Sequence, residues 1–258
     1  MRKWGRRFIF SIQFLTRYPI SAQLYLQLDD FPRSSAFFPF AGALVGLFAV
    51  GCAYVGWWTA SDIAAAIAAT LGYVLVTGAF HVDGLADTFD GMKIRSVPEA
   101  RLARMKNPRV GVRGSLALIV DMLVHIVLIY LLYRQYEHME IYRMLVAAPV
   151  ASRFGIVAAC VTSHSAKADG IGAPFINEMN GWDLFRALIV AGGCLYALIG
   201  WQMAAVLVGM EVLLSIAASK WLGIWLRGIT GDTLGCINEF GQWFALALFG
   251  VIWPLIIQ

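Results

Sequence analysis

Long apolar stretches alternate with short polar segments along almost the whole chain. Seven of them are long enough to cross about 30 Å of hydrocarbon as helices that rise about 1.5 Å per residue. Lipid offers the backbone no hydrogen-bond partner, and the stretches lack the alternation of barrel strands, so we interpret all seven as transmembrane helices. They cover residues 36–58, 62–81, 114–133, 141–163, 184–200, 203–225 and 240–257.

The segment before the first span has a different pattern. Basic residues precede the apolar run 8–15, which Gln13 and Arg17 interrupt, and no Ala-x-Ala cleavage site follows. This predicts a helix lying at the membrane interface rather than a cleaved signal. No repeat or low-complexity tract divides the chain. We therefore expect residues 1–258 to form one all-α domain, a polytopic bundle of about seven transmembrane helices with an N-terminal interfacial helix.

Composition excludes several classes of protein. Hydrophobic residues make up 60% of the 258 and charged residues 14%, whereas ordinary globular chains carry about 25% charge; the mean hydropathy is +0.71. A net charge of +4 is too small to indicate a nucleic-acid partner. Four cysteines without a Cys-x-x-Cys pair argue against a disulfide framework or a zinc site. We therefore expect the protein to be surrounded by membrane lipid.

Positive charge predicts the orientation of the chain. Of the 20 Lys and Arg residues, 17 fall in the N-terminal segment and the loops after the second, fourth and sixth spans, while only Arg134 and Arg143 lie on the other side. Such residues concentrate in cytoplasmic segments. We therefore expect the N-terminus and those three loops to face the cytoplasm.

Three aspartates follow the second span at helical spacing. Asp83, Asp87 and Asp90 stand at i, i+4 and i+7, within one helical stripe about 60° wide. Three carboxylates on one stripe repel one another, and a divalent cation removes the conflict. Hard oxygen ligands suit Mg²⁺, which keeps positions free for waters and phosphate oxygens. The pattern favours a Mg²⁺ site at these three residues; a solvated helix end with Asp83 as N-cap is the alternative.

The next loop supplies the opposite charge, from Arg101, Arg104, Lys106, Arg109 and Arg113. Guanidinium and ammonium groups suit phosphate oxygens, although positive-inside bias alone also places cations here. Carboxylates and cations together indicate phosphoryl transfer. We predict Lys106 and Arg109, on either side of Pro108, as donors to the transferred group, and rank Arg101 and Arg104 below them.

A second polar segment, residues 227–239, follows the sixth span. Asp232 and Glu239 are seven residues apart, on one face if the segment is helical. The predicted topology puts them on the same side as the aspartates, so the two segments are candidates for one site. The alternative is an ordinary turn capped by Asp232.

Several charged residues lie inside or beside the spans, where charge is costly. Asp121 and His125 are four residues apart, and we expect them to hydrogen-bond each other. Arg153 and Glu211 have no partner nearby in the sequence, so they either pair across helices or line a substrate cleft. Arg33, just before the first span, either snorkels to the interface or binds phosphate.

Three motifs together resemble a known family. Residues 81–91 (HVDGLADTFDG), 104–111 (RMKNPRVG) and 231–235 (GDTLG) are similar to the signatures of the adenosylcobinamide-GDP ribazoletransferases, also called cobalamin 5′-phosphate synthases. Arg33 ahead of Pro39 and Gly42 resembles that family's N-terminal pattern. Asn107 and Gln242 depart from it, since acidic residues are common at both positions, and Asn107 is therefore left out of the metal site.

The resemblance implies a Mg²⁺-dependent enzyme of the bacterial inner membrane that acts late in vitamin B12 assembly. Such enzymes join α-ribazole or its 5′-phosphate to adenosylcobinamide-GDP and release GMP. On this basis we expect Asp83, Asp87, Asp90, Lys106 and Arg109 to be catalytic. We expect substrate contacts from Arg33, His81, Arg104, Arg153, Asp232 and Glu239.

Three other functions remain as alternatives. A membrane prenyltransferase would typically show paired acidic clusters, and a CDP-alcohol phosphotransferase would carry Ala-Arg after its first Asp-Gly. A cation transporter would place its carboxylates near the bilayer midplane in broken helices. The sequence leaves open the base of the nucleoside, its phosphorylation, the number of metal ions and homo-oligomerisation.

Overall fold

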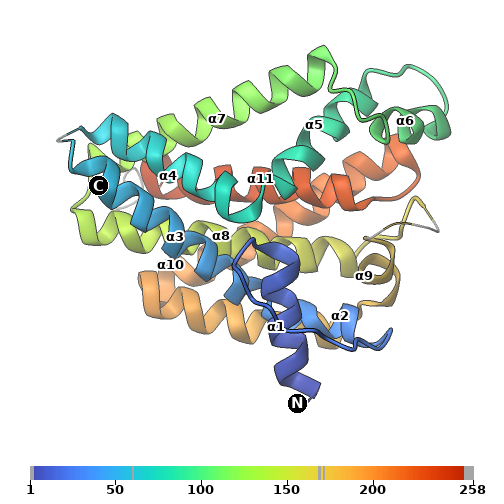
Figure 1. Ribbon diagram of the computed structural model, residues 1–258, viewed down its shortest axis with the longest axis horizontal. Helices are drawn as coiled ribbons and strands as arrows, with labels where there is room; N and C mark the ends of the chain where they lie inside the picture. The colour runs from blue at the N-terminus through green and yellow to red at the C-terminus, as the bar shows by residue number, and fades with distance from the viewer. Residues whose placement is uncertain (1–2, 60, 168–169, 171, 253–258) are drawn as a thin grey trace.

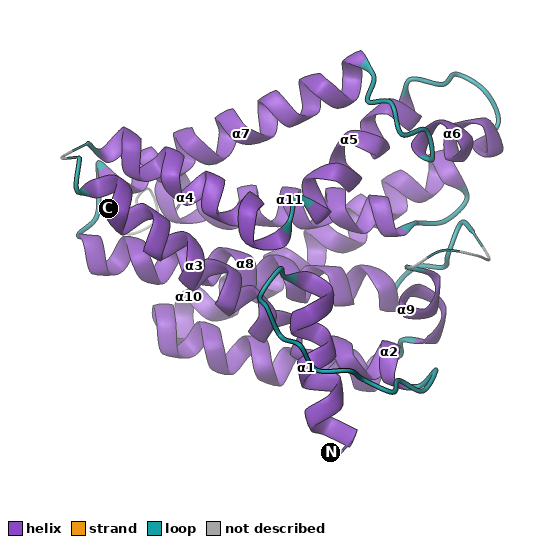
Figure 2. Cartoon of the chain, in the orientation of Figure 1, coloured by secondary structure: helices purple, strands orange, loops and turns teal. Residues whose placement is uncertain are grey.

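The computed structural model describes residues 3–59, 61–167, 170 and 172–252. Over these ranges the regular elements are all helices, and the one β-type pairing is a single bridge between Ser165 and Ile229 (Figure 2). The predicted all-helical architecture is therefore confirmed.

Eleven α-helices and two short η elements make up the described chain. Their bounds are α1 Lys3–Leu15, α2 Asp30–Ser34, η1 Ser35–Phe37, α3 Phe38–Trp57, α4 Asp62–Thr77, α5 Phe80–Met92, α6 Pro98–Met105, α7 Val112–Tyr133, α8 His138–Val161, α9 Ala173–Glu178, α10 Gly181–Leu226, α11 Gly231–Ala247 and η2 Leu248–Ile252.

Helix α8 forms the centre of the bundle. Within an apolar segment of 18 residues, 94% of the α8 residues are buried, against 28% for the corresponding segment of α7. Helix α8 packs against α3, α10 and α11. Gly42 and Gly46 of α3 face α8 so closely that an added Cβ would lie 2.2 Å from the Pro149 carbonyl oxygen and 2.5 Å from the Val146 Cα. Small residues here let the two backbones approach, as in many membrane helix pairs.

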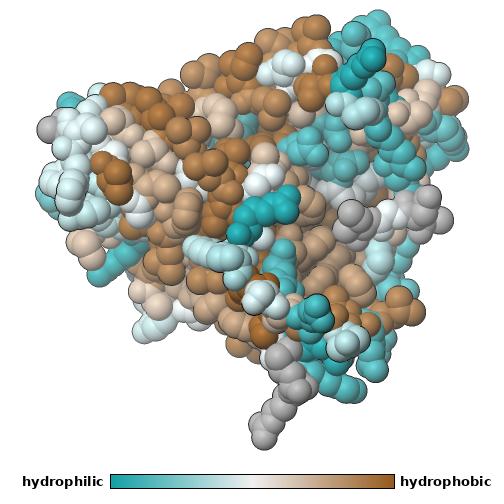
Figure 3. Space-filling view, in the orientation of Figure 1, coloured by the Kyte–Doolittle hydropathy of each residue, from teal (hydrophilic) through white to brown (hydrophobic). Residues whose placement is uncertain are grey.

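The outer surface is apolar where a membrane would surround it. Helix α7 exposes Leu116, Ile119, Leu123 and Val127, and Figure 3 shows apolar side chains over much of the same face. Five helices are long and apolar enough to cross a membrane, or six if the bent pair α4–α5 counts as one span. The chain is thus a multi-pass membrane protein, and the predicted number of about seven spans is approximate.

The second predicted span, 62–81, ends earlier than expected. Helix α4 stops at Thr77, because Gly78 and Ala79 both adopt left-handed backbone conformations with φ of 62°. The chain then turns by 90° into α5. The aspartates that follow therefore lie on a packed helix rather than in a loop.

The fifth and sixth predicted spans both lie within α10, which breaks at Gly200 (φ 76°, ψ 169°). The two ends of α10 return to the same region. Close to its start, Asn177 accepts a hydrogen bond from the Ser165 amide; just beyond its end, the Ile229 amide donates to the His164 carbonyl. The two halves of α10 therefore run in opposite directions, with their turn where the sequence predicts it.

Most segments that connect the long helices lie at two ends of the molecule, while the turn between α4 and α5 lies between these ends (Figure 1). At one end Arg101 in α6 donates to the Trp225 carbonyl at 2.6 Å. At the other end the rings of Trp57 and His138 lie 4.7 Å apart. This separation agrees with the predicted alternation of loops.

The N-terminal segment forms the predicted helix, α1, and it packs inward at its C-terminal end. Ser11, Ile12 and Leu15 are buried. Arg6 and Arg7, counted above as topological charges, pair with the buried Asp30 at 2.5 and 2.9 Å. Helix α1 is thereby fixed to the start of the first span.

Candidate active site

Helices α5 and α11 cross at two glycines. A Cβ on Gly84 would lie 2.6 Å from the Asp232 carbonyl oxygen, and one on Gly235 would lie 2.8 Å from the His81 carbonyl oxygen. These contacts leave no room for a side chain at either position. The crossing therefore brings the start of α11 directly against the stripe of aspartates on α5.

Three carboxylates share one open cavity of about 330 Å³ beside this crossing. Asp83 and Asp87 come from α5 and Asp232 from α11, and Lys106 and Lys167 line the same space. The negative charges of Asp83, Asp232 and Asp90 repel the carboxylate of Asp87. Lys167 approaches Asp232 at 3.8 Å. The cavity thus combines a self-repelling acidic cluster with two ammonium groups, which suits a divalent cation and a phosphorylated substrate.

Asp90, the third predicted ligand, has different surroundings. It is 3% exposed, and its carboxylate accepts hydrogen bonds from the Arg104 side chain at 2.7 Å and the Gly114 amide at 2.9 Å. The Gly111 amide donates to it as well. Asp90 therefore ties the loop after α6 and the start of α7 to α5, while Asp83 and Asp87 stay open to the cavity.

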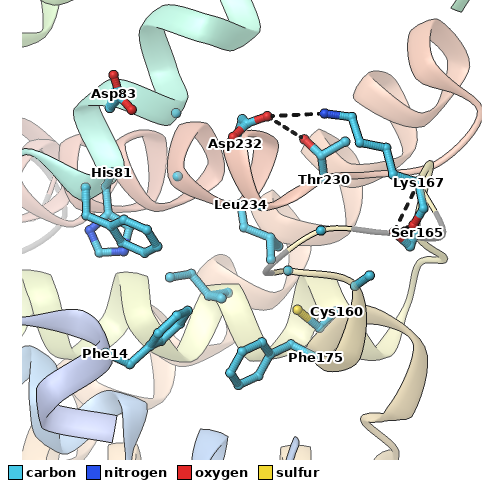
Figure 4. Close-up of a pocket in the computed structure, with 18 of the residues that line it drawn as sticks. Phe14, His81, Asp83, Cys160, Ser165, Lys167, Phe175, Thr230, Asp232 and Leu234 are labelled. Carbon is cyan, nitrogen blue, oxygen red and sulfur yellow. Dashed lines mark hydrogen bonds and ion pairs between the residues drawn. The ribbon is translucent and has the colours of Figure 1, made fainter. Parts of the chain in front are cut away.

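A second cavity, of about 220 Å³, continues from the first and shares Asp83, Asp232, Lys106 and Lys167 with it. Its inner wall is aromatic and aliphatic, from Phe14, Phe38, Phe80, Phe175, Ile156 and Cys160. Figure 4 shows Phe14 and Phe175 on the side opposite Asp83 and Asp232, with Lys167 beside Asp232. The two cavities form one site with a charged mouth and an apolar interior.

Behind the site lies a buried polar network between helices α7, α8 and α11. Arg153 on α8 donates to Gln242 at 2.8 Å, and the Gln242 amide nitrogen lies 3.0 Å from His125. The predicted Asp121–His125 pair is present, with 3.4 Å between carboxylate and ring. Glu239 lies 3.9 Å from the same ring. The network thus brings two carboxylates, a guanidinium and an imidazole together inside the bundle.

His81 joins this network to the site. Its Nδ1 lies 3.4 Å from the Arg153 guanidinium, its Nε2 has no hydrogen-bond partner among the described residues, and the residue lines the apolar cavity. Arg153 and Glu239, both predicted as substrate contacts, line neither of the two cavities just described. Their described contacts lie within the network.

The remaining predicted residues are dispersed. Arg33 pairs with the buried Asp183 at the start of α10, and the Arg109 side chain is exposed. Glu211 fits against Gly155 and Gly241. Arg101, which was ranked low as a phosphate ligand, donates hydrogen bonds to the Ile94 and Trp225 carbonyls. The structure thus brings together Asp83, Asp87, Asp232 and Lys106 from the predicted set, with His81 at the edge of the apolar cavity.

Two components of the site escaped the sequence argument. Lys167 was counted only as a topological charge, and its 61-residue distance from Lys106 hides their proximity. The aromatic wall combines residues from α1, α3, α5 and α9. Phenylalanines in apolar segments are so common that no local signal distinguishes these four.

Comparison with known proteins places the chain in a family. The model of the cobalamin-5-phosphate synthase family matches residues 7–250. A relative from Clostridium novyi named adenosylcobinamide-GDP ribazoletransferase is 31% identical over 94% of this chain and 96% of its own. One of the same name from Ralstonia nicotianae is 34% identical over 93% and 92%. No solved structure matches the chain.

These matches cover nearly the whole chain and include both helices of the α5–α11 crossing. The chain belongs to the cobalamin-5-phosphate synthase family, and it is an enzyme of the transferase class.

Proposed function

We propose that this member of the cobalamin-5-phosphate synthase family joins α-ribazole, or its 5′-phosphate, to adenosylcobinamide-GDP and releases GMP. The family match and the names of the relatives support the reaction type. The observation that carries the proposal is the cavity in which Asp83, Asp87 and Asp232 lie with Lys106 and Lys167. A diphosphate substrate needs a cation and positive side chains in one place.

The donor set of this cavity fits Mg²⁺. Three carboxylates from two helices repel one another when no cation is bound, and oxygen ligands are those that Mg²⁺ prefers. Asp83, Asp87 and Asp232 would hold the ion, and Asp90 would act by positioning the loop that carries Lys106. The ion would neutralise charge on the diphosphate and the departing GMP.

The chain's own residues then bind and orient the substrates. Lys106 and Lys167 donate to phosphate oxygens that gain negative charge as the bond to GMP breaks. A hydroxyl oxygen of the ribazole forms the new bond to the phosphorus next to cobinamide, and its proton passes to a carboxylate of the cavity. GMP leaves as a phosphate monoester, so atoms and charge balance without a covalent enzyme intermediate.

The same proposal assigns the compartment. The end of the bundle with α6, Lys167 and Asp232 carries the excess of Lys and Arg, which indicates the cytoplasmic side of a bacterial inner membrane. Nucleotide substrates would reach the site from there.

A direct assay tests the reaction. Purified protein in detergent is mixed with adenosylcobinamide-GDP and α-ribazole 5′-phosphate, with Mg²⁺ or with EDTA, and GMP and the cobamide product are quantified. We expect equal amounts of both products, formed only with Mg²⁺. Asp87→Asn should lose at least about a hundredfold in turnover, or about 2.7 kcal/mol, while Asp62→Asn at the opposite end should keep it. Full turnover in EDTA, or in Asp87→Asn, would contradict the metal assignment; absence of product from folded protein would contradict the reaction.

A further inference from the structure

We infer that the apolar cavity inside the charged mouth binds the flat, weakly polar base of the ribazole, while its ribose lies at the mouth. This inference rests on the proposed function and names the position of one of its two substrates. The cavity has two parts of opposite chemistry, a charged mouth shared with the acidic cluster and an aromatic interior. A nucleoside has the same two parts.

The shape and size of the interior limit what can enter. A cavity of about 220 Å³ is smaller than the roughly 300–1,000 Å³ of pockets that enclose whole drug-sized ligands. It is therefore too small for a corrin ring, and it fits one planar bicyclic base. The corrin of the other substrate has to remain outside this cavity.

The wall chemistry selects between the two bases in the reaction. Phe14, Phe38 and Phe175 pack on one another with ring centroids 5.1–6.2 Å apart, and Ile156 and Cys160 complete the wall. Guanine carries several hydrogen-bond donors and acceptors along its edges, and the Nε2 of His81 can pair with one of them. Each of the others that faces this aromatic and aliphatic wall would be left unpaired at a cost of about 1–3 kcal/mol. A benzimidazole with methyl substituents has apolar edges and a face that stacks on aromatic rings.

The mouth fits the remainder of a ribazole. Lys106 and Lys167 border both cavities, so a 5′-phosphate on the ribose would have ammonium partners there. The ribose hydroxyls would then face the acidic cluster, where the proposed reaction takes place. The placement explains why one site joins an apolar cavity to a metal-binding mouth.

Cys160 offers a way to fill the cavity without touching the charged mouth. It is fully buried on α8 and lines the inner wall, so Cys160→Leu adds volume to the space that the base would occupy. Cys194→Leu on α10 is the matched control, because Cys194 is half-buried and lies away from both cavities. Gel filtration and thermal melting in detergent establish that both variants are folded.

Kinetics and binding together test the inference. We expect Cys160→Leu to raise the KM for α-ribazole 5′-phosphate at least about tenfold and to leave the KM for adenosylcobinamide-GDP within about twofold, with Cys194→Leu unchanged. In calorimetry without the second substrate, α-ribazole should bind the full-length protein more tightly than guanosine, and Cys160→Leu should remove that difference. A rise in KM confined to adenosylcobinamide-GDP, or equal binding of the two nucleosides, would overturn the inference and leave the reaction standing. Binding of α-ribazole that depends on Cys160, without turnover, would overturn the proposed reaction instead.

Discussion

Asp87 and Asp90 are three residues apart on α5, yet the same substitution should destabilise the protein only at Asp90. Asp90 is buried and accepts hydrogen bonds from Arg104 and from the Gly111 and Gly114 amides. In the unmodified protein these donors share the two oxygens of a carboxylate, whereas an Asn side chain offers them one. The substitution also removes the negative charge that pairs with Arg104. Removing one member of a buried ion pair costs about 3–5 kcal/mol.

The position of the pair sets the magnitude within that range. The Asp90 side chain is 4% exposed and the Arg104 side chain 19%, so water partly compensates the arginine, and the lower value of about 3 kcal/mol applies. For a chain of this length, 1 kcal/mol corresponds to roughly 2–4 °C in melting temperature. Asp90→Asn should therefore melt about 6–12 °C below the unmodified protein.

Asp87→Asn removes a charge that has three carboxylates around it. Without a divalent cation that charge is repelled, so the variant should melt at the same temperature as the unmodified protein or above it. Added Mg²⁺ stabilises a folded state that binds it, and this gain should be smaller in Asp87→Asn than in the unmodified protein.

Thermal melting in detergent, followed by tryptophan fluorescence in EDTA and then in Mg²⁺, measures all three proteins under identical conditions. The reasoning fails if Asp87→Asn and Asp90→Asn lower the melting temperature in EDTA by the same amount. It also fails if Asp90→Asn melts like the unmodified protein.

Three further outcomes are expected. Gly84→Ala should push α11 away from α5 and reduce turnover at least tenfold, whereas Gly192→Ala, where the space around the glycine is open, should be active; equal activities would refute the close crossing. Lys106→Ala should reduce kcat more than Arg109→Ala, because only the lysine lines the cavity, and steady-state kinetics with equal losses would contradict this. In a background without native cysteines, cysteines at the exposed positions Arg109 and Met139 should be labelled by an impermeant maleimide from opposite sides of the membrane, Arg109 from the cytoplasm; labelling from the same side would refute the topology.

The length of the apolar stretches was sufficient to predict the long helices, and helical spacing was sufficient for the aspartate stripe. The spacing of Asp83 and Asp87 places both on one face of α5, and the structure shows both at one cavity. The 90° bend after Thr77 was harder to foresee. Glycine commonly ends helices, so Gly78 was a candidate helix end. Alanine rarely adopts a left-handed conformation, so the conformation of Ala79 could not be predicted from the sequence.

Contacts between distant segments limited the prediction of the site. The spacing of Asp90 fits a metal ligand as well as a structural anchor, and its contacts with Arg104 and with the Gly111 and Gly114 amides distinguish the two roles. Likewise Asp121 and His125 were predictable as a local pair, while Gln242 joins that pair through a contact across 117 residues. Such roles depend on packing, which a single sequence does not specify.

The break at Gly200 determines at which end of the bundle α11 begins. A helix that reverses halfway returns the chain to the end from which it started, so α11 begins at the end of the bundle where α10 began. Asp232 therefore emerges at the end that holds Asp83 and Lys167. An uninterrupted α10 would deliver α11 to the opposite end and separate the carboxylates by the thickness of the membrane. A single residue that lies far from the chemistry thus decides on which side half of the site is assembled.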